Sequence, residues 1–186
     1  MSLPVVIVLA SGRGERFIAS GGIGSKLQAM LAGKTVLQRT LDAVLASGLP
    51  FHLEAAGHEG MGDSIAAGVR ATPDAPGWLV LPGDLPLVRP DSLLRVAHAL
   101  GAHAVVLPRY LGQRGHPVGF AAACLGPLRS LRGNEGAAGI VRSFAAAGRV
   151  GELELEDAGI VTDIDTLQDL ARASGLLDHR AGDTRP

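Results

Sequence analysis

Two glycines and two arginines in the stretch SGRGERF could bind a phosphorylated group. Gly12 and Gly14 leave room for backbone amides to approach an anion, and Arg13 and Arg16 add positive charge beside them. An ordinary turn with two exposed arginines would give the same pattern. The stretch is therefore a candidate phosphate loop that needs support from elsewhere in the chain.

The same stretch departs from two well-known phosphate-binding patterns. A dinucleotide-binding fingerprint needs a third glycine where Phe17 stands, and a helix that follows at once, whereas the next helix is predicted from Thr35. A Walker loop needs the sequence GK[ST], which this stretch does not contain. The pattern disfavours an oxidoreductase that binds a dinucleotide.

Three aspartates at the ends of predicted strands could bind a metal ion. Asp84 follows the apolar segment GWLVLP, and Asp163 and Asp165 share one face if their segment is extended. Mg²⁺ takes one or two carboxylates and completes its shell with water and phosphate oxygens, so Asp84 and Asp165 would make such a site. The alternatives are a turn former at Asp84, a solvated side chain at Asp163 and a helix-capping group at Asp165.

Lysine is rare in this chain, which makes its positions conspicuous. Of the 17 basic residues, only Lys26 and Lys34 are lysines. An ammonium group is a compact point charge suited to a phosphate, whereas a guanidinium group favours flat two-point contacts. We predict a phosphate contact for Lys26 and assign no function to Lys34.

Buried strands that alternate with helices would position these residues. The run 4–10 is apolar and rich in β-branched residues, as expected of a strand covered on both faces, and 11–26 is predicted as a loop. A helix is predicted from Thr35 to a stop at Gly48. Its buried face is predicted to comprise Val36, Leu37, Thr40, Leu41, Val44 and Leu45.

The rest of the chain continues this alternation. Further strands are predicted over 50–55, 77–82, 102–108, 118–122, 152–157 and 159–165, with a loop over 109–117. Further helices are predicted near Asp63, from Pro90, over 123–131 and 134–148, and from Thr166, with a fraying tail from Leu177. The pattern predicts an α/β fold with a mostly parallel sheet, whose ligands bind at the carboxyl ends of the strands. The three candidate segments should meet there.

Composition narrows the class of protein. A chain of 186 residues is long enough for one domain with a full core. A net charge of -1 gives no general attraction to nucleic acid or to an anionic membrane, so we expect a small partner. Cys124 is the only cysteine, and no run is apolar enough to span a membrane, so we expect a cytoplasmic protein. Cys124 and Trp78 are expected in the core.

Seven segments occur in an order that resembles a known family. They are LASGRGERF, Lys26, GMGDSIAAG, LPGDLPLV, RGHPVGF, GNEGAAG and DIDT. The order resembles the MobA-like nucleotidyltransferases, and most of all their molybdenum cofactor cytidylyltransferases. The resemblance covers about residues 4–172. It implies a single-domain, three-layer Rossmann-like fold over 1–175, followed by a polar tail over 176–186.

The resemblance also implies an activity and a set of residues. The activity is transfer of a nucleoside monophosphate, CMP before GMP, from an NTP to the phosphate of molybdopterin, with Mg²⁺ as cofactor and pyrophosphate as product. Arg13 and Lys26 would stabilise charge in catalysis, Asp84 and Asp165 would bind the metal, and Arg114 and His116 would bind the acceptor. The nucleotide would be bound by Leu9, Ala10, Ser11, Gly12, Arg13, Gly14, Arg16, Lys26 and Ser64. A molybdoenzyme or its chaperone is a possible protein partner.

Several alternatives remain open at this point. The family usually has AAG or AGG where this chain has ASG at 10–12, which leaves the base undetermined, and 51–61 is short for a strand with its own helix. A GTP-using or sugar-phosphate nucleotidyltransferase, or a non-catalytic cofactor binder, would share most of the pattern. His116 could be a structural hydrogen-bonding group and Ser64 a helix cap. His58 and Glu59 are expected in a turn.

Overall fold

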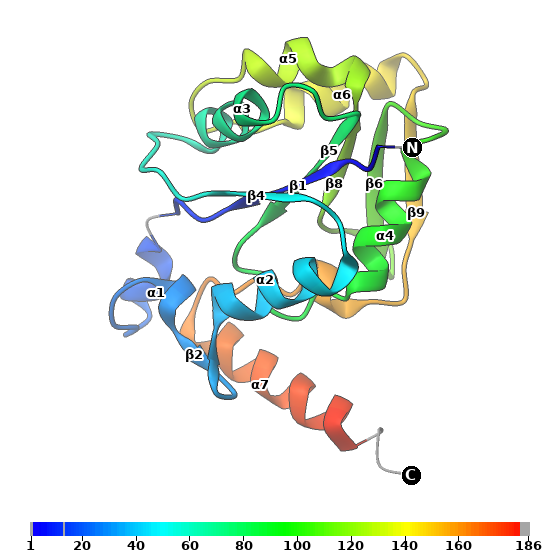
Figure 1. Ribbon diagram of the computed structural model, residues 1–186. Coiled ribbons are helices and arrows are strands. Elements are labelled where there is room, and N and C mark those ends of the chain that lie inside the picture. Colours follow the sequence, from blue (N-terminus) through cyan, green and yellow to red (C-terminus); the bar gives the residue numbers. More distant parts are fainter. Residues whose placement is uncertain (1, 13, 183–186) are drawn as a thin grey trace.

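The computed structural model describes residues 2–12 and 14–182 and places one seven-stranded sheet between two layers of helices (Figure 1). The sheet order is β4-β1-β5-β8-β6-β7, and β9 pairs with β6. The strands are β1 Val5–Leu9, β4 Phe51–Glu54, β5 Gly77–Pro82, β6 Val105–Tyr110, β7 Gln113–Arg114, β8 Val118–Ala121 and β9 Val150–Glu154. Two short strands, β2 Met30–Leu31 and β3 Lys34–Thr35, form a separate hairpin.

Most strands run in one direction, as the sequence predicted. Strand β1 is parallel to both β4 and β5, and β9 is parallel to β6. Strand β8 lies between β5 and β6 and is antiparallel to both, so β6 runs in the same direction as β5. Only β8 and the short β7 oppose the common direction among the described strands of this sheet. The predicted α/β fold with a mostly parallel sheet is confirmed.

The helices cover both faces of the sheet. Helices α3 Met61–Ala71, α5 Leu125–Arg129 and α6 Ala138–Ala146 lie on one face, and α2 Val36–Ser47 and α4 Pro90–Ala99 lie on the other (Figure 1). Each face has its own apolar core, and the sheet separates the two. Trp78 and Cys124 are fully buried in the core under α3 and α5, as expected.

Helix α2 begins and ends where the sequence indicates. Thr35 and Gln38 form a reciprocal capping box, and Gly48 ends the helix in the left-handed conformation at φ 69°. The predicted buried face is wrong at one position: Leu45 is 60% exposed, and Ala43 and Ser47 are buried instead. Ala43 and Val44 pack into the apolar core that α2 shares with α4 and the sheet.

The segment 11–26, predicted as a loop, contains a helix. Helix α1 Glu15–Ala19 starts directly after Gly14, whose φ of 64° lies in the left-handed region. A short 3₁₀ helix, η1 Lys26–Gln28, follows. The expectation that no helix comes before Thr35 is therefore wrong, although Phe17 still stands where the dinucleotide fingerprint needs glycine. Phe17 is buried in a third small core, where it anchors α1.

The C-terminal region also differs from expectation. The segment 159–165 is not a strand, because η3 Ala158–Val161 forms there and Asp157 caps it by accepting from the amide of Gly159 at 2.9 Å. Gly159 lies against the backbone of Leu87 so closely that a Cβ would come within 2.0 Å of its carbonyl oxygen. The chain therefore crosses the loop after β5 instead of joining the sheet. This crossing brings the segment DID beside that loop.

The last helix is longer than predicted. Thr166 caps α7 Leu167–Gly182 by accepting from the amide of Asp169 at 3.2 Å, as expected. The helix continues to Gly182, past the expected boundary at 175 and through the start of the predicted fraying tail.

Three further elements bear on the sequence predictions. The predicted loop 109–117 contains the end of β6 and strand β7, joined by a turn at Leu111 and Gly112. The segment 122–124 forms the 3₁₀ helix η2 Ala122–Cys124. The short region 51–61 does hold a strand, β4, and α3 begins at Met61, after the six residues 55–60.

Candidate active site

The lysine and the two aspartates singled out by the sequence meet at the strand ends. The Lys26 Nζ donates hydrogen bonds to Asp84 Oδ2 and Asp165 Oδ1, each at 2.6 Å. Asp84 follows β5, Asp165 precedes α7, and Lys26 opens η1, so three distant segments supply one cluster. All three side chains are largely buried, and that of Lys26 is 11% exposed. We call this cluster the cation end.

Arg16 adds a second cation to the cluster. Its Nη1 lies 2.5 Å from Asp165 Oδ2, while its side chain is 78% exposed. An exposed ion pair of this kind contributes little to stability, so the guanidinium is free to exchange a carboxylate for another anion. Helix α1 thus presents Arg16 at the edge of the site.

The charges of the cluster shift the pKa values of its members. Burial alone would lower the pKa of Lys26, but the charge of Asp84 and hydrogen bonds to both carboxylates outweigh it and raise the pKa. Lys26 is therefore an ammonium at neutral pH. Burial, with the nearby charges of Asp165 and Asp84, raises the pKa of Asp163. Asp163 lies near the cluster but makes no ion pair with Lys26.

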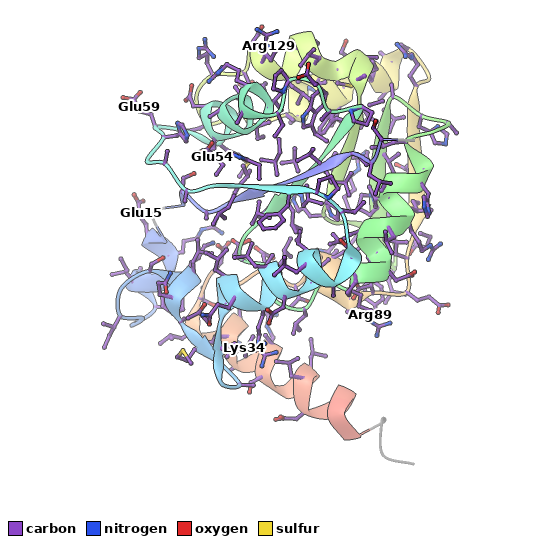
Figure 2. All side chains as sticks on the ribbon, viewed as in Figure 1. Glu15, Lys34, Glu54, Glu59, Arg89 and Arg129 are labelled. Carbon is purple, nitrogen blue, oxygen red and sulfur yellow. The ribbon has the colours of Figure 1, made fainter. Side chains whose placement is uncertain are left out.

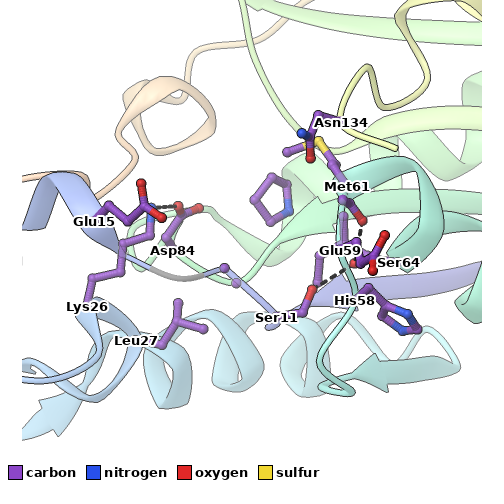
Figure 3. Close-up of a pocket in the computed structure, with 15 residues that line it drawn as sticks. Ser11, Glu15, Lys26, Leu27, His58, Glu59, Met61, Ser64, Asp84 and Asn134 are labelled. Carbon is purple, nitrogen blue, oxygen red and sulfur yellow. Dashed lines mark hydrogen bonds and ion pairs between the residues drawn. The ribbon is translucent and has the colours of Figure 1, made fainter. Parts of the chain in front are cut away.

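A pocket of about 370 Å³ opens beside Lys26 and Asp84 (Figure 3). A second hollow of about 290 Å³ shares Gly12, Glu15 and Lys26 with it. The larger pocket is lined by Leu9, Ser11, Gly12, Glu15, Lys26, Leu27, His58, Glu59, Gly60, Met61, Ser64, Pro82, Gly83, Asp84 and Asn134. The smaller one is lined by Gly12, Gly14, Glu15, Arg16, Phe17, Lys26 and Asp165. Lys26 lies at the junction of the two.

Most of the predicted nucleotide-binding residues line one of these hollows. Leu9, Ser11, Gly12 and Ser64 line the larger pocket, and the smaller one takes in Gly14 and Arg16. Ala10 does not reach either; its side chain packs against the third core. Arg13 lies outside the described residues, so its predicted roles in nucleotide binding and catalysis remain predictions.

At the far end of the larger pocket, two hydroxyl groups bond to each other and one of them to a backbone carbonyl. Ser11 Oγ and Ser64 Oγ are 2.8 Å apart, and Ser64 Oγ donates to the carbonyl oxygen of Gly60 at 3.2 Å (Figure 3). Ser64 is buried and sits in the first turn of α3. We call these three residues the serine end.

A carboxylate that sequence reasoning missed supports the wall beside the serine end. Glu54, at the end of β4, bonds to His58 Nε2 at 3.0 Å, His52 Nε2 at 3.3 Å and the Ala56 amide at 3.1 Å. Burial opposes ionisation of Glu54, but these hydrogen bonds outweigh it and lower its pKa. Glu54, Glu15 and Glu59 lie on the same side of the molecule in Figure 2, and Glu54 is buried there.

Four of the pocket residues missed by the sequence analysis are Glu15, Glu59, Met61 and Asn134. His58 and Glu59 lie in the irregular segment between β4 and α3, which bends at Glu59 and forms part of the pocket wall. The segment GNEGAAG, one of the seven segments of the resemblance, was the available signal for Asn134.

The two predicted acceptor residues lie in different surroundings. His116 is largely buried, and its Nδ1 has no hydrogen-bond partner within the described residues. Burial lowers its pKa, while the charges of Asp84 and Asp163 and a hydrogen bond to the Val80 backbone oppose the shift, so His116 lies near the cation end. Arg114 is exposed on β7, with its Nη2 3.9 Å from Glu152 Oε1, and neither Arg114 nor His116 lines either hollow.

The cation end has the donor set that Mg²⁺ prefers. Two carboxylate oxygens from Asp84 and Asp165 converge on one positive atom, and Asp84 Oδ1 is buried without a hydrogen-bond partner in the described chain. No three His, Cys, Asp or Glu side chains within 2–12 and 14–182 form a complete metal site. Two carboxylates fit an ion that takes its other ligands from water and phosphate.

Comparison with known proteins shows the family. A sequence profile of the MobA-like NTP transferase domain matches residues 6–150. The purine catabolism protein PucB of Bacillus subtilis strain 168 is 30% identical over 169 residues, which are 83% of this chain and 80% of that protein. The chain therefore belongs to the MobA-like NTP transferase family, as the seven segments indicated.

Solved structures share the fold. The protein Rv0371c of Mycobacterium tuberculosis H37Rv is 25% identical, with a TM-score of 0.78 over 94% of this chain and 99% of that one. The molybdopterin-guanine dinucleotide biosynthesis protein A of Archaeoglobus fulgidus is 19% identical, with a TM-score of 0.61 over 94% and 99% of the two chains.

Among the described residues, no helix combines the length and the apolarity that crossing a bilayer requires.

Proposed function

We propose that this member of the MobA-like NTP transferase family transfers a nucleoside monophosphate, CMP in the first place, from an NTP to the terminal phosphate of molybdopterin. The observation that carries the proposal is the position of Lys26, between two carboxylates and at the junction of two hollows. A triphosphate in the hollows would meet its positive charge. The choice of molybdopterin is supported by the order of the seven segments.

The chain's own residues would bind and align the triphosphate. Lys26 and Arg16 supply positive charge, and the amides at Gly12 and Gly14 can approach phosphate oxygens closely. Asp84 and Asp165 would hold Mg²⁺. When bound, this ion would neutralise charge on the phosphates and help to align them.

The reaction needs no side-chain nucleophile. An oxygen of the acceptor phosphate bonds to the α-phosphorus of the NTP as the bond from that phosphorus to the bridging oxygen breaks, and pyrophosphate leaves with the electron pair. Negative charge gathers between the acceptor phosphate and the triphosphate. The main contribution of Lys26 to the reaction is therefore to stabilise this charge. Of the two acceptor candidates we favour His116, because its pKa is affected by the charges of Asp84 and Asp163 and its buried Nδ1 has no hydrogen-bond partner among the described residues.

Pyrophosphate release tests this function directly. The purified chain is incubated with molybdopterin and Mg²⁺ and with CTP, GTP, ATP or UTP in turn. Release that needs both molybdopterin and a nucleotide, and is fastest with CTP, is the expected result. If release is fastest with GTP, the proposed reaction stands and the preferred base is guanine instead of cytosine. Tight binding of a nucleotide without release would favour a cofactor binder over an enzyme.

A further inference from the structure

The two ends of the larger pocket suit different parts of a nucleotide. Lys26 and Asp84 lie at one end, and Ser11, Ser64 and Asn134 lie toward the other (Figure 3). Because the proposed function, on which this inference rests, sets the triphosphate against Lys26, the base falls at the serine end. The hydroxyl and amide groups there are uncharged donors and acceptors of the kind that distinguish one base from another, and Glu59 lies beside them (Figure 3).

The hydrogen bonds at the serine end are kept together by one arrangement of the hydroxyl hydrogens. A carbonyl oxygen only accepts, so the 3.2 Å bond between Ser64 and Gly60 uses the Ser64 hydroxyl hydrogen. Either hydroxyl could donate in the 2.8 Å bond between Ser11 and Ser64, and the two bonds form together only when Ser11 donates. In that arrangement Ser11 has no hydrogen left for a ligand. Its hydroxyl offers the pocket only lone pairs, and it can only accept.

The carbonyl that starts this chain of bonds is held rigidly. Gly60 is pressed against Gly133, so that a Cβ on Gly60 would come within 2.2 Å of the Gly133 carbonyl. The amide of Gly62 donates to the Gly133 carbonyl at 2.7 Å, and Asp63 Oδ2 accepts from the Gly133 amide at 2.9 Å. These contacts clamp the start of α3 and leave the Gly60 carbonyl little freedom to turn.

We propose that Ser11 selects a nucleobase with an exocyclic amino group, and that Ser64 is a positioning residue that turns the Ser11 hydroxyl into an acceptor. Cytosine offers a 4-amino donor where uracil has a 4-oxo acceptor, so the site prefers CTP to UTP. The 2-amino group of guanine distinguishes GTP from ITP in the same way. An oxo group facing Ser11 would set two acceptors against each other.

Equilibrium binding separates this inference from the proposed function. Without an acceptor phosphate there is no turnover, so titration calorimetry in Mg²⁺ measures affinity for CTP, UTP, GTP and ITP, and for inorganic tripolyphosphate as a probe without a base. The four nucleotides form two pairs, in each of which the amino nucleotide (CTP or GTP) has an oxo partner (UTP or ITP). In the wild type, the amino nucleotide of at least one pair should bind about tenfold more tightly than its oxo partner, as one hydrogen bond allows. Equal affinity within both pairs would overturn the inference.

Two serine variants test the direction of the bonds. Ser11→Ala should reduce the preference for the amino nucleotide to about twofold or less, as expected when one hydrogen bond is lost. Ser64→Ala frees the Ser11 hydroxyl to donate, so affinity for the oxo nucleotide should rise while affinity for the amino nucleotide changes little. Ser47→Ala removes another buried hydroxyl, on α2 and outside the pocket, and should leave all affinities unchanged.

The outcomes of these titrations are distinct. An unchanged preference in Ser11→Ala would overturn the selection by Ser11, and an equal loss of affinity for both nucleotides in Ser64→Ala would reduce Ser64 to a structural role. If tripolyphosphate binds and the bases are not distinguished, the inference fails alone. If neither tripolyphosphate nor any nucleotide binds, the proposed function fails and this inference fails with it.

Discussion

At the cation end of the pocket, Lys26 is bound by two carboxylates at 2.6 Å, whereas at the serine end Ser11 and Ser64 bind each other at 2.8 Å. The first set of contacts is between charges that a bound anion or metal ion would rearrange. The second is between neutral groups whose partners, down to the Gly60 carbonyl, are packed in place. The contrast suggests that one end changes its contacts on binding and the other keeps them.

The largest expected effect comes from removing a carboxylate at the cation end. Asp84→Ala should lower the rate of pyrophosphate release by about a thousandfold or more, since both the cation site and the position of Lys26 depend on this carboxylate. The matched control is Asp42→Ala, which breaks the exposed 2.6 Å pair between Lys34 and Asp42. Wild-type rates in Asp84→Ala would contradict the assignment, and a large loss in Asp42→Ala would show that the effect is not specific.

A smaller effect is expected when the lysine itself is replaced. Lys26→Met leaves two largely buried carboxylates facing each other, so the free energy of unfolding should fall by about 2 kcal/mol. Lys34→Met removes a lysine that is 55% exposed, on the β2–β3 hairpin away from Glu15 and Glu59 (Figure 2), and should change stability by about 0.5 kcal/mol or less. Urea unfolding measures both variants.

The same pair of variants tests whether the contacts of the cation end can be exchanged. If Lys26 occupies the place of a metal ion, Mn²⁺ should restore stability to Lys26→Met in the absence of nucleotide and have little effect on the wild type or Lys34→Met. Equal effects of Mn²⁺ on all three proteins would show that ammonium and metal do not compete for Asp84 and Asp165.

The cation end was more predictable from sequence than the serine end. Lys26, Asp84 and Asp165 were expected to meet because each follows or borders a predicted strand, and the carboxyl ends of parallel strands share one edge of the sheet. The three residues do meet, although the prediction of a strand over 159–165 is wrong. The segment reaches the site because Gly159 packs against Leu87, a contact between distant residues that no local pattern shows.

The serine end depends almost entirely on such distant contacts. Ser11 and Ser64 were both singled out, but the bond between them requires α3 to lie against β1, and this close approach depends on Gly68, where a Cβ would come within 2.6 Å of the Ile7 side chain. Helix α1 was missed for a similar reason. It is five residues long and is held by burial of Phe17 in the third core, so its own periodicity is too short to indicate a helix.

The smallest expected effect concerns Glu54, which supports the wall beside the serine end. Its pKa is below the usual 4.5, because hydrogen bonds from His58, His52 and the Ala56 amide outweigh burial. A lowered pKa means that the carboxylate stabilises the fold fully above pH 4.5, and that this contribution is lost as the pH falls through the folded-state pKa. Glu54→Gln should therefore make the loss of stability below pH 4.5 shallower, as measured by thermal unfolding between pH 3 and 7.

Part of the acid sensitivity should remain in Glu54→Gln, because Asp169 also has a lowered pKa: its hydrogen bonds with Thr166 and Arg172 outweigh burial. Asp169→Asn is the matched control for the acid limb only, since it removes another carboxyl with a lowered pKa but also the acceptor of a 3.1 Å hydrogen bond from the Asp165 amide at the cation end. Both variants should flatten the acid limb, and Glu54→Gln should also weaken nucleotide binding, because His58 lines the pocket. Unchanged nucleotide affinity in Glu54→Gln would mean that the wall does not depend on this carboxylate, and that the rigidity of the serine end comes from the Gly60 clamp alone.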